Sequence, residues 1–371
     1  MRILHVADTH LGMRQYGLEA RRRDFAAAFA QVVDAAVEAR VDAVIHAGDL
    51  FDNRFPTTLD LTDVIGQLQR LRQAEVPFLG VVGNHEGKRG TQWLDLFAQL
   101  GLAVHLDAQR PFDLGGVPVV GVDFAGRNPE QMPVPKVSGG VLVMHQLLQA
   151  EGVSGAGELR LAPLFESGAR LVLLGDYHEH RVWRQGKTLV SYAGSTERAS
   201  AAERARRGVS ILALETLALE RRELDTRRFV YLGAADAPLA SPLAEFEARA
   251  RELDGAVAVV HAAGAEPTPR KLYAEGLARG ALHVVVRRTQ AADPDAEAGV
   301  AQLDSVEQLD AVLDEAVQRA LAATPHAVPD GVDGEAVLAL ARRADQLVRD
   351  PGVPDAQVDG RVTELLAEAK L

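Results

Sequence analysis

Clusters of Asp, His and Asn recur along the first half of this sequence, each at the end of a short apolar run. The five clusters are VADTH (residues 6–10), HAGDLFD (46–52), VGNHE (82–86), VMHQ (143–146) and LLGDYHEH (173–180). A single histidine in such a place is as often a core residue as a ligand. Five clusters after five apolar runs indicate one polar site assembled from distant segments.

These residue types are suited to holding divalent metal ions. Asp8 and His10 lie two residues apart, so their side chains point the same way from an extended segment and can chelate one ion. Asp49 is placed to bridge that ion to a second one, for which Asn84 and His145 offer ligands. Two ions about 3.5–4 Å apart activate water and neutralise charge on phosphoryl oxygens, so the pattern predicts hydrolysis of phosphoesters.

The donor types restrict the choice of metal. The chain contains no cysteine, so any ion must bind to His, carboxylate or amide groups. Mixed oxygen and nitrogen donors suit manganese, iron or zinc better than calcium. The last cluster leaves an alternative open, because Asp176, His178 and His180 alternate at spacing two and more than one pair of them can complete the ligand sets.

The apolar runs before the clusters predict buried strands that position these residues. The predicted strands cover residues 3–7, 43–47, 78–82, 117–122, 141–144 and 171–174. Apolar residues at helical spacing predict helices at 24–39 and 58–74. Strands that alternate with helices predict an α/β sandwich, in which sites form beyond the strand ends.

Charge is unevenly distributed along the 371 residues, whose net charge is −12. Residues 231–371 carry 13 of the 40 basic and 24 of the 52 acidic residues. This shift, together with the small residues at 233–238, predicts a domain boundary. The negative charge argues against a protein that coats nucleic acid by charge alone, although it allows a local basic groove.

Beyond this boundary the sequence predicts a small α/β unit and then helices. The predicted elements are helices near 243–253 and 269–278, strands at 256–261 and 282–288, and amphipathic helices at 306–322, 334–348 and 362–369. The final helices either bind a partner or pack on their own domain.

The motif order D-x-H, GDxxD, GNH[DE], a single His after a strand and G-[HD]-x-H resembles the calcineurin-like metallophosphoesterase superfamily. Longer segments are similar to the SbcD-type DNA repair exonucleases over about residues 1–230, namely LHVADTHLGMRQYGLEARRRDF, VDAVIHAGDLFDNRFPTTLD and VGNHEGKRG. The resemblance implies a two-sheet metallophosphoesterase sandwich flanked by helices at 1–232. A small α/β DNA-capping domain would follow at 233–300, and C-terminal helices at 301–371.

The resemblance also implies an activity and its residues. It implies manganese-dependent exonuclease and endonuclease activity on DNA, with two divalent ions as cofactors. The residues that match the family's ligands are Asp8, His10, Asp49, Asn84, His145 and His178, joined by either Asp176 or His180. His85 matches a catalytic histidine that binds no metal and that stabilises charge or protonates the leaving oxygen. A rival hypothesis keeps the metals and makes the substrate a small phosphodiester or a phosphoprotein.

DNA contacts are expected near the motifs. Arg14, Tyr16 and Lys88 are the residues expected to face the DNA backbone. The run at residues 21–23 predicts either the solvated start of a helix or a phosphate contact.

Partners are implied by the resemblance alone. They are an SMC-type ATPase resembling SbcC and a second copy of this chain, the latter contacted through segments 58–73 and 91–100, which could equally be ordinary core helices. No apolar stretch approaches the ~18 residues of a membrane span, and the sequence runs directly into a strand pattern without a signal peptide. A cytoplasmic protein without membrane contact is therefore expected.

Overall fold

The structure is a computed structural model, in which residues 1–87, 90–126, 134–150, 153 and 157–288 are described. The chain divides into two units, residues 1–290 and 291–371. The predicted C-terminal helices and Lys88 lie outside the described residues.

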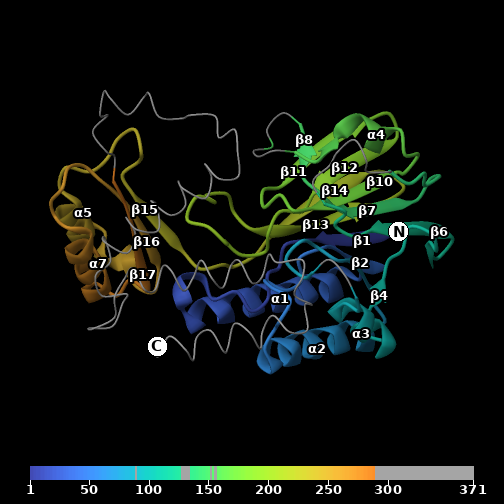
Figure 1. The fold of residues 1–371 in the computed structure, drawn as a ribbon, viewed down its shortest axis with the longest axis horizontal. Coiled ribbons are helices and arrows are strands. Elements are labelled where there is room, and N and C mark those ends of the chain that lie inside the picture. Colours follow the sequence, from blue (N-terminus) through green and yellow to red (C-terminus); the bar gives the residue numbers. More distant parts are fainter. Residues whose placement is uncertain (88–89, 127–133, 151–152, 154–156, 289–371) are drawn as a thin grey trace, which may run out of the picture. The chain divides into compact units, whose positions relative to one another are not determined.

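Two six-stranded sheets form the larger part of the first unit (Figure 1). The first sheet, in the order β14-β13-β1-β2-β3-β4, comprises β1 (Arg2–Val6), β2 (Ala43–Ala47), β3 (Phe78–Val81), β4 (Val104–His105), β13 (Gly208–Ala213) and β14 (Ala218–Glu223). The second sheet, in the order β11-β12-β10-β7-β6-β5, comprises β5 (Phe112–Leu114), β6 (Val117–Val122), β7 (Val141–His145), β10 (Leu171–Gly175), β11 (Arg181–Gln185) and β12 (Thr188–Tyr192). A separate short pair consists of β8 (Leu148–Gln149) and β9 (Leu159–Arg160).

Helices cover the outer faces of the two sheets. The first sheet packs against α1 (Glu19–Ala39), α2 (Thr58–Gln73) and α3 (Trp93–Gln99), and the second against α4 (Leu161–Phe165). Leu4 and Val44 contact the helix side, whereas Ile3 and Ile45 fill the space between the sheets. The central strands are therefore buried on both faces, which explains their unbroken apolar runs and confirms the predicted α/β sandwich. No helix in the described part of the chain has the length and hydropathy of a membrane span.

The strand directions bring the polar clusters together. β1, β2 and β3 run parallel to one another, and β7 and β10 form a second parallel set. Parallel strands end at the same edge of their sheet, so the loops after these strands converge there. His145 Nδ1 donates to Ala47 O at 2.7 Å and thereby joins the two sheets at this edge.

A three-stranded parallel sheet follows, in the order β15-β16-β17. Its elements are β15 (Phe229–Leu232), α5 (Pro242–Ala248), α6 (Ala250–Leu253), β16 (Val257–Ala262), α7 (Pro269–Ala278) and β17 (His283–Arg288). The predicted strands and helices of this region are present. The sheet begins before the predicted boundary at 233, because β15 pairs with β16 rather than with the first two sheets.

Candidate metal centre

Four of the predicted ligands adopt left-handed backbone conformations that non-glycine residues rarely adopt. Their φ angles are +52° at Asp8, +42° at His10, +57° at Asp49 and +86° at Asp176. Each residue lies just beyond a strand, where the chain turns sharply at the sheet edge. Such conformations cost about 1–3 kcal/mol each and are typical of functional sites.

Two glycines allow the ligand loops to approach closely. A Cβ atom at Gly48 would lie 2.3 Å from His145 Nδ1, and one at Gly83 would lie 2.0 Å from Asp49 Oδ1. Real Cβ atoms do not tolerate such contacts, so the glycines of the GD and GNH motifs are required for the ligands to meet.

The first cluster consists of Asp8, His10 and His178, whose ligand atoms all lie within 4.8 Å of one another. His10 Nε2 and His178 Nε2 are 3.2 Å apart. Asp8 Oδ2 is buried without a hydrogen-bond partner in the described structure. An unpartnered carboxylate oxygen beside two imidazole nitrogens fits the donor set of a divalent ion.

The second cluster consists of Asn84, His145 and Asp176, with Asp49 between the two clusters. His145 Nε2 lies 3.0 Å from Asn84 Oδ1, 3.4 Å from Asp49 Oδ2 and 3.7 Å from Asp176 Oδ1. The same Asp49 Oδ2 lies 3.9 Å from His10 Nε2 in the first cluster. Asp49 therefore occupies the position that a bridging carboxylate needs.

Hydrogen bonds on the far side of two rings orient them. His145 Nδ1 is held by Ala47 O, and His178 Nδ1 donates to the Glu203 carboxylate at 2.8 Å. Each ring consequently directs Nε2 toward the clusters. Glu203 was not among the predicted residues, because it lies in the run ERARR and shares no spacing with the motifs.

Burial and charge shift the protonation of these groups. Burial raises the pKa of Asp8 to about 6 and lowers the pKa of His10 to about 3. Burial also opposes a charge on His145, but Asp49, Asp8 and Asp176 outweigh it and raise the pKa of His145 to about 10. The carboxylates that attract this proton attract a divalent cation in the same way, and metal binding displaces the proton from a histidine.

His85 lies at the solvent side of both clusters. Its backbone N–H donates to Asp49 Oδ1 at 3.0 Å, and its Nδ1 donates to Asp52 O at 2.8 Å. Its ring packs edge-on against His10, with 4.8 Å between the ring centroids. The His85 side chain is 44% exposed, whereas those of His10 and Asp49 are almost fully buried. His85 can therefore contact a substrate that approaches from solvent.

The structure separates the members of the last sequence cluster. Asp176 faces His145, and its N–H donates to Asp8 Oδ1 at 3.0 Å. His178 lies in the first cluster. His180 donates from Nδ1 to Tyr192 O at 2.8 Å, which ties its ring to β12.

The residues expected to contact DNA lie in different surroundings. Arg14 is exposed and forms an ion pair with Glu19 at 3.2 Å. Tyr16 stacks on His283 of β17, with 4.1 Å between the ring centroids and 10° between the ring planes. One face of the Tyr16 ring is therefore covered by a side chain of the three-stranded sheet.

The basic run at the start of α1, residues 21–23, is mostly buried and paired with acidic side chains. Arg21 is fully buried and pairs with Asp24 at 2.6 Å, while buried Arg22 pairs with Asp60 at 3.1 Å. Arg23 alone of the three is exposed. A solvated helix start or a phosphate contact is therefore wrong for Arg21 and Arg22, whose charges are neutralised inside the protein.

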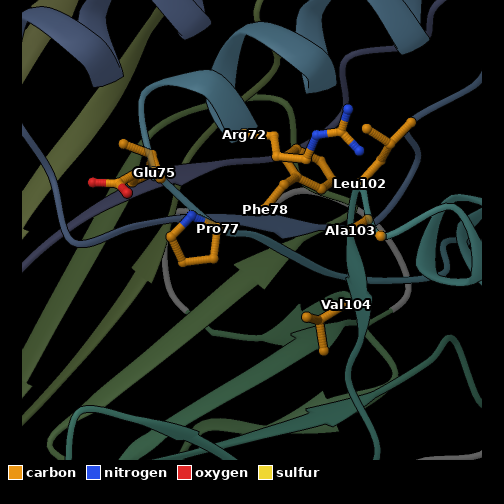
Figure 2. Close-up of a pocket in the computed structure, with 9 residues that line it drawn as sticks. Arg72, Glu75, Pro77, Phe78, Leu102, Ala103 and Val104 are labelled. Carbon is orange, nitrogen blue, oxygen red and sulfur yellow. The ribbon is translucent and has the colours of Figure 1, made fainter.

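A cavity of about 270 Å³ lies away from this centre, where β3 and β4 begin (Figure 2). The residues labelled there include Arg72, Glu75, Pro77, Phe78 and Leu102. None of the predicted metal ligands lines this cavity. The metal centre lies at the opposite ends of these strands.

This chain is similar to known phosphoesterases and DNA repair proteins. The calcineurin-like phosphoesterase family matches residues 1–181. The DNA double-strand break repair protein Mre11 of Methanosarcina mazei is 44% identical over 248 residues, which cover 63% of this chain and 40% of that protein. The protein of the same name from Halobacterium salinarum is 36% identical and covers 100% of this chain and 94% of its own length. The protein of the same name from Haloferax volcanii is 35% identical, and the match covers 99% of this chain and 82% of that protein.

The chain thus spans 40% of the length of the Methanosarcina mazei relative, and nearly the whole Halobacterium salinarum relative. The likeness to the Halobacterium salinarum and Haloferax volcanii relatives covers 100% and 99% of this chain and is therefore not confined to the two six-stranded sheets. This chain belongs to the Mre11 family of DNA double-strand break repair proteins and carries a calcineurin-like phosphoesterase domain.

Proposed function

We propose that this chain is a manganese-dependent DNA nuclease, with exonuclease and endonuclease activity, that hydrolyses phosphodiester bonds at a two-metal site. The observation that carries the proposal is the position of Asp49. A single oxygen, Asp49 Oδ2, lies 3.9 Å from His10 Nε2 and 3.4 Å from His145 Nε2. A carboxylate between two sets of donors is what a pair of ions requires.

The chain's own residues have separable roles in this proposal. The first ion would be held by Asp8, His10, Asp49 and His178, and the second by Asp49, Asn84, His145 and Asp176. Two divalent ions supply an activated water and compensate the charge of the phosphoryl oxygens. Mixed oxygen and imidazole donors fit manganese. Glu203 and Ala47 hold the His178 and His145 rings in the orientation that binding requires.

His85 would act on the leaving oxygen. Its Nδ1 is occupied by Asp52 O, so Nε2 is the nitrogen that faces the substrate side. A protonated His85 can donate from Nε2 to the oxygen that departs from phosphorus, or stabilise the charge on the phosphoryl oxygens.

DNA is the proposed substrate because the relatives carry the name of a DNA double-strand break repair protein. Exposed Arg14 is available for a phosphate contact, and Tyr16 and Lys88 are the other proposed contacts. The proposed role is that of the nuclease subunit in double-strand-break repair and recombination, in the cytoplasm. Its proposed partner is an SbcC-like SMC-type ATPase, bound through residues 301–371, for which the sequence predicts helices.

The function is tested with the purified full chain and three substrates. These are end-labelled duplex DNA, labelled single-stranded DNA and a small chromogenic phosphodiester, each assayed with Mn²⁺ and with a chelator. We expect metal-dependent cleavage of DNA. Cleavage of the small ester alone would instead support a phosphodiesterase or phosphatase with a substrate other than DNA. Adding the ATPase partner distinguishes an inactive enzyme from one that needs its complex.

A homodimer is part of the proposal, because apolar side chains remain exposed on α2, just before α2, on α3 and just after α3. Phe55 is 82% exposed, and Leu59, Leu96 and Leu100 are also exposed. We expect light scattering to show twice the 39.8 kDa chain mass for the wild type. The double variant Leu59→Glu/Leu96→Glu should be monomeric, because two buried charges oppose association.

Leu277→Glu is the matched control for this dimer prediction. Leu277 is an exposed apolar residue on α7, outside segments 58–73 and 91–100, so this variant should remain dimeric. A wild type that elutes as a monomer at micromolar concentration would reject the dimer without affecting the proposed chemistry.

A further inference from the structure

His105, at the end of β4, lies between two carboxylates. Its Nδ1 donates to Asp95 Oδ1 at 2.6 Å, and its Nε2 donates to Asp123 Oδ1 and Oδ2 at 3.0 and 3.1 Å. A ring that donates from both nitrogens is an imidazolium. Burial opposes this charge, but Asp123 and Asp95 outweigh it and raise the pKa of His105 to about 9.

Asp123 connects this cation to the loop of Asn84. The Val82 N–H donates to Asp123 Oδ1 at 2.8 Å, and the Phe124 N–H donates to Val82 O at 2.9 Å. Both backbone groups of Val82 are therefore held by the segment that follows β6. Val82 lies two residues before Asn84, so this contact sets where the Asn84 loop leaves β3.

The same segment also reaches the loop of His145. The Ala125 N–H donates to the Gln146 side chain at 3.0 Å, and the Phe124 ring packs edge-on against His145, with 6.3 Å between the ring centroids. Residues 123–125 therefore contact both the loop that carries Asn84 and the loop that carries His145, and fix the position of one relative to the other. Those loops meet where Asn84 Oδ1 lies 3.0 Å from His145 Nε2.

We infer that His105 is a positioning residue for the second metal ion: its cation fixes Asp123, and residues 123–125 in turn hold Asn84 opposite His145. This inference rests on the proposed two-metal function. Among the described residues, no such hydrogen bond or ring contact joins residues 123–125 to Asp8, His10 or His178. Loss of His105 should therefore weaken the binding of one ion and not of the other.

Arg110 provides a matched comparison. A cavity of about 580 Å³ is lined by Asp95, His105, Asp107, Arg110 and Asp123. Arg110 is 87% exposed and pairs with Asp107 at 3.5 Å. Arg110→Gln and His105→Gln each remove one positive charge from this cavity, but only the second removes the cation that Asp123 contacts.

The inference is tested by titrating the metal-free full chain with Mn²⁺, by calorimetry and by electron paramagnetic resonance of the coupled ion pair. The wild type should bind two ions. In His105→Gln the second ion should bind about 10–100-fold more weakly, as is usual when a residue behind a ligand is lost, while the first binds as in the wild type. Arg110→Gln should bind both the first and the second Mn²⁺ ion as tightly as the wild type does.

A second variant separates positioning from general stability. Asp123→Asn keeps an oxygen for the Val82 N–H but loses the charge that His105 contacts, so it should show the same selective weakening. The inference is overturned if His105→Gln binds both ions normally, or if both variants lose both ions or their cooperative unfolding. Two bound ions without DNA cleavage, with the ATPase partner also present, would reject the nuclease function and leave this inference intact.

The stability of the wild type relative to His105→Gln should depend on pH. A raised histidine pKa contributes stability that is complete below the unfolded value near 6.5 and is lost as pH rises through about 9. The difference in melting temperature should therefore shrink between pH 6.5 and pH 10. The charged groups that line the cavity with His105 are Asp95, Asp107, Arg110 and Asp123, and Arg110→Gln should not show this trend.

Discussion

Replacing His85 by alanine is expected to slow DNA cleavage by about 10²–10⁴-fold, the usual contribution of a general acid, while both metal ions remain bound. His85 is the exposed histidine of the centre, and its Nδ1 is occupied by Asp52 O. Its removal should therefore leave both donor sets intact. The measurement is the cleavage rate of labelled duplex DNA beside the Mn²⁺ stoichiometry of the same sample.

The leaving group distinguishes the two roles of His85. A nitrophenolate departs without a proton, so a general acid contributes little to cleavage of a nitrophenyl phosphodiester. His85→Ala should then lose far less activity on that ester than on DNA. Equal losses on both substrates would instead indicate that His85 stabilises charge on the phosphoryl oxygens. A lost metal ion would show that His85 is a ligand.

The central strands could be predicted because they are buried on both faces. Runs such as residues 43–47 and 117–122 consist almost wholly of apolar residues, and their observed bounds are the same. β12 and β13 are equally buried but were not predicted. Their sequences contain Ser191 and Ser210, which are buried and hydrogen-bonded, so the apolar run is interrupted.

Residue types and order indicated the ligands, but the partners behind them could not be predicted. The carboxylate that orients His178 comes from Glu203, 25 residues further along the chain. The buried pair of Arg22 and Asp60 likewise joins two helices 38 residues apart. A charge run gives no sign of such partners, because the pairing depends on how the helices pack.

The final sequence cluster left open whether Asp176 or His180 joins His178 as a ligand, and the structure gives a reason to expect Asp176. Asp176 Oδ1 lies 3.7 Å from His145 Nε2, and its backbone contacts Asp8. The His180 ring is instead fixed to Tyr192 O, and burial together with Arg221 lowers its pKa. Asp176 is therefore the expected ligand beside His178, and His180 is expected to stay outside both donor sets.

Asp176→Ala is accordingly expected to bind the second ion at least about 100-fold more weakly, since a lost ligand should cost no less than a lost residue behind one. DNA cleavage should fall with it. His180→Ala is the matched control, because it removes a cluster member two residues beyond His178 and leaves both donor sets in place. Mn²⁺ titration of the two variants shows whether Asp176 or His180 is the ligand of the second ion. Loss of an ion in His180→Ala, with normal binding in Asp176→Ala, would transfer the ligand role to His180 and require the ring to leave Tyr192 when metal binds.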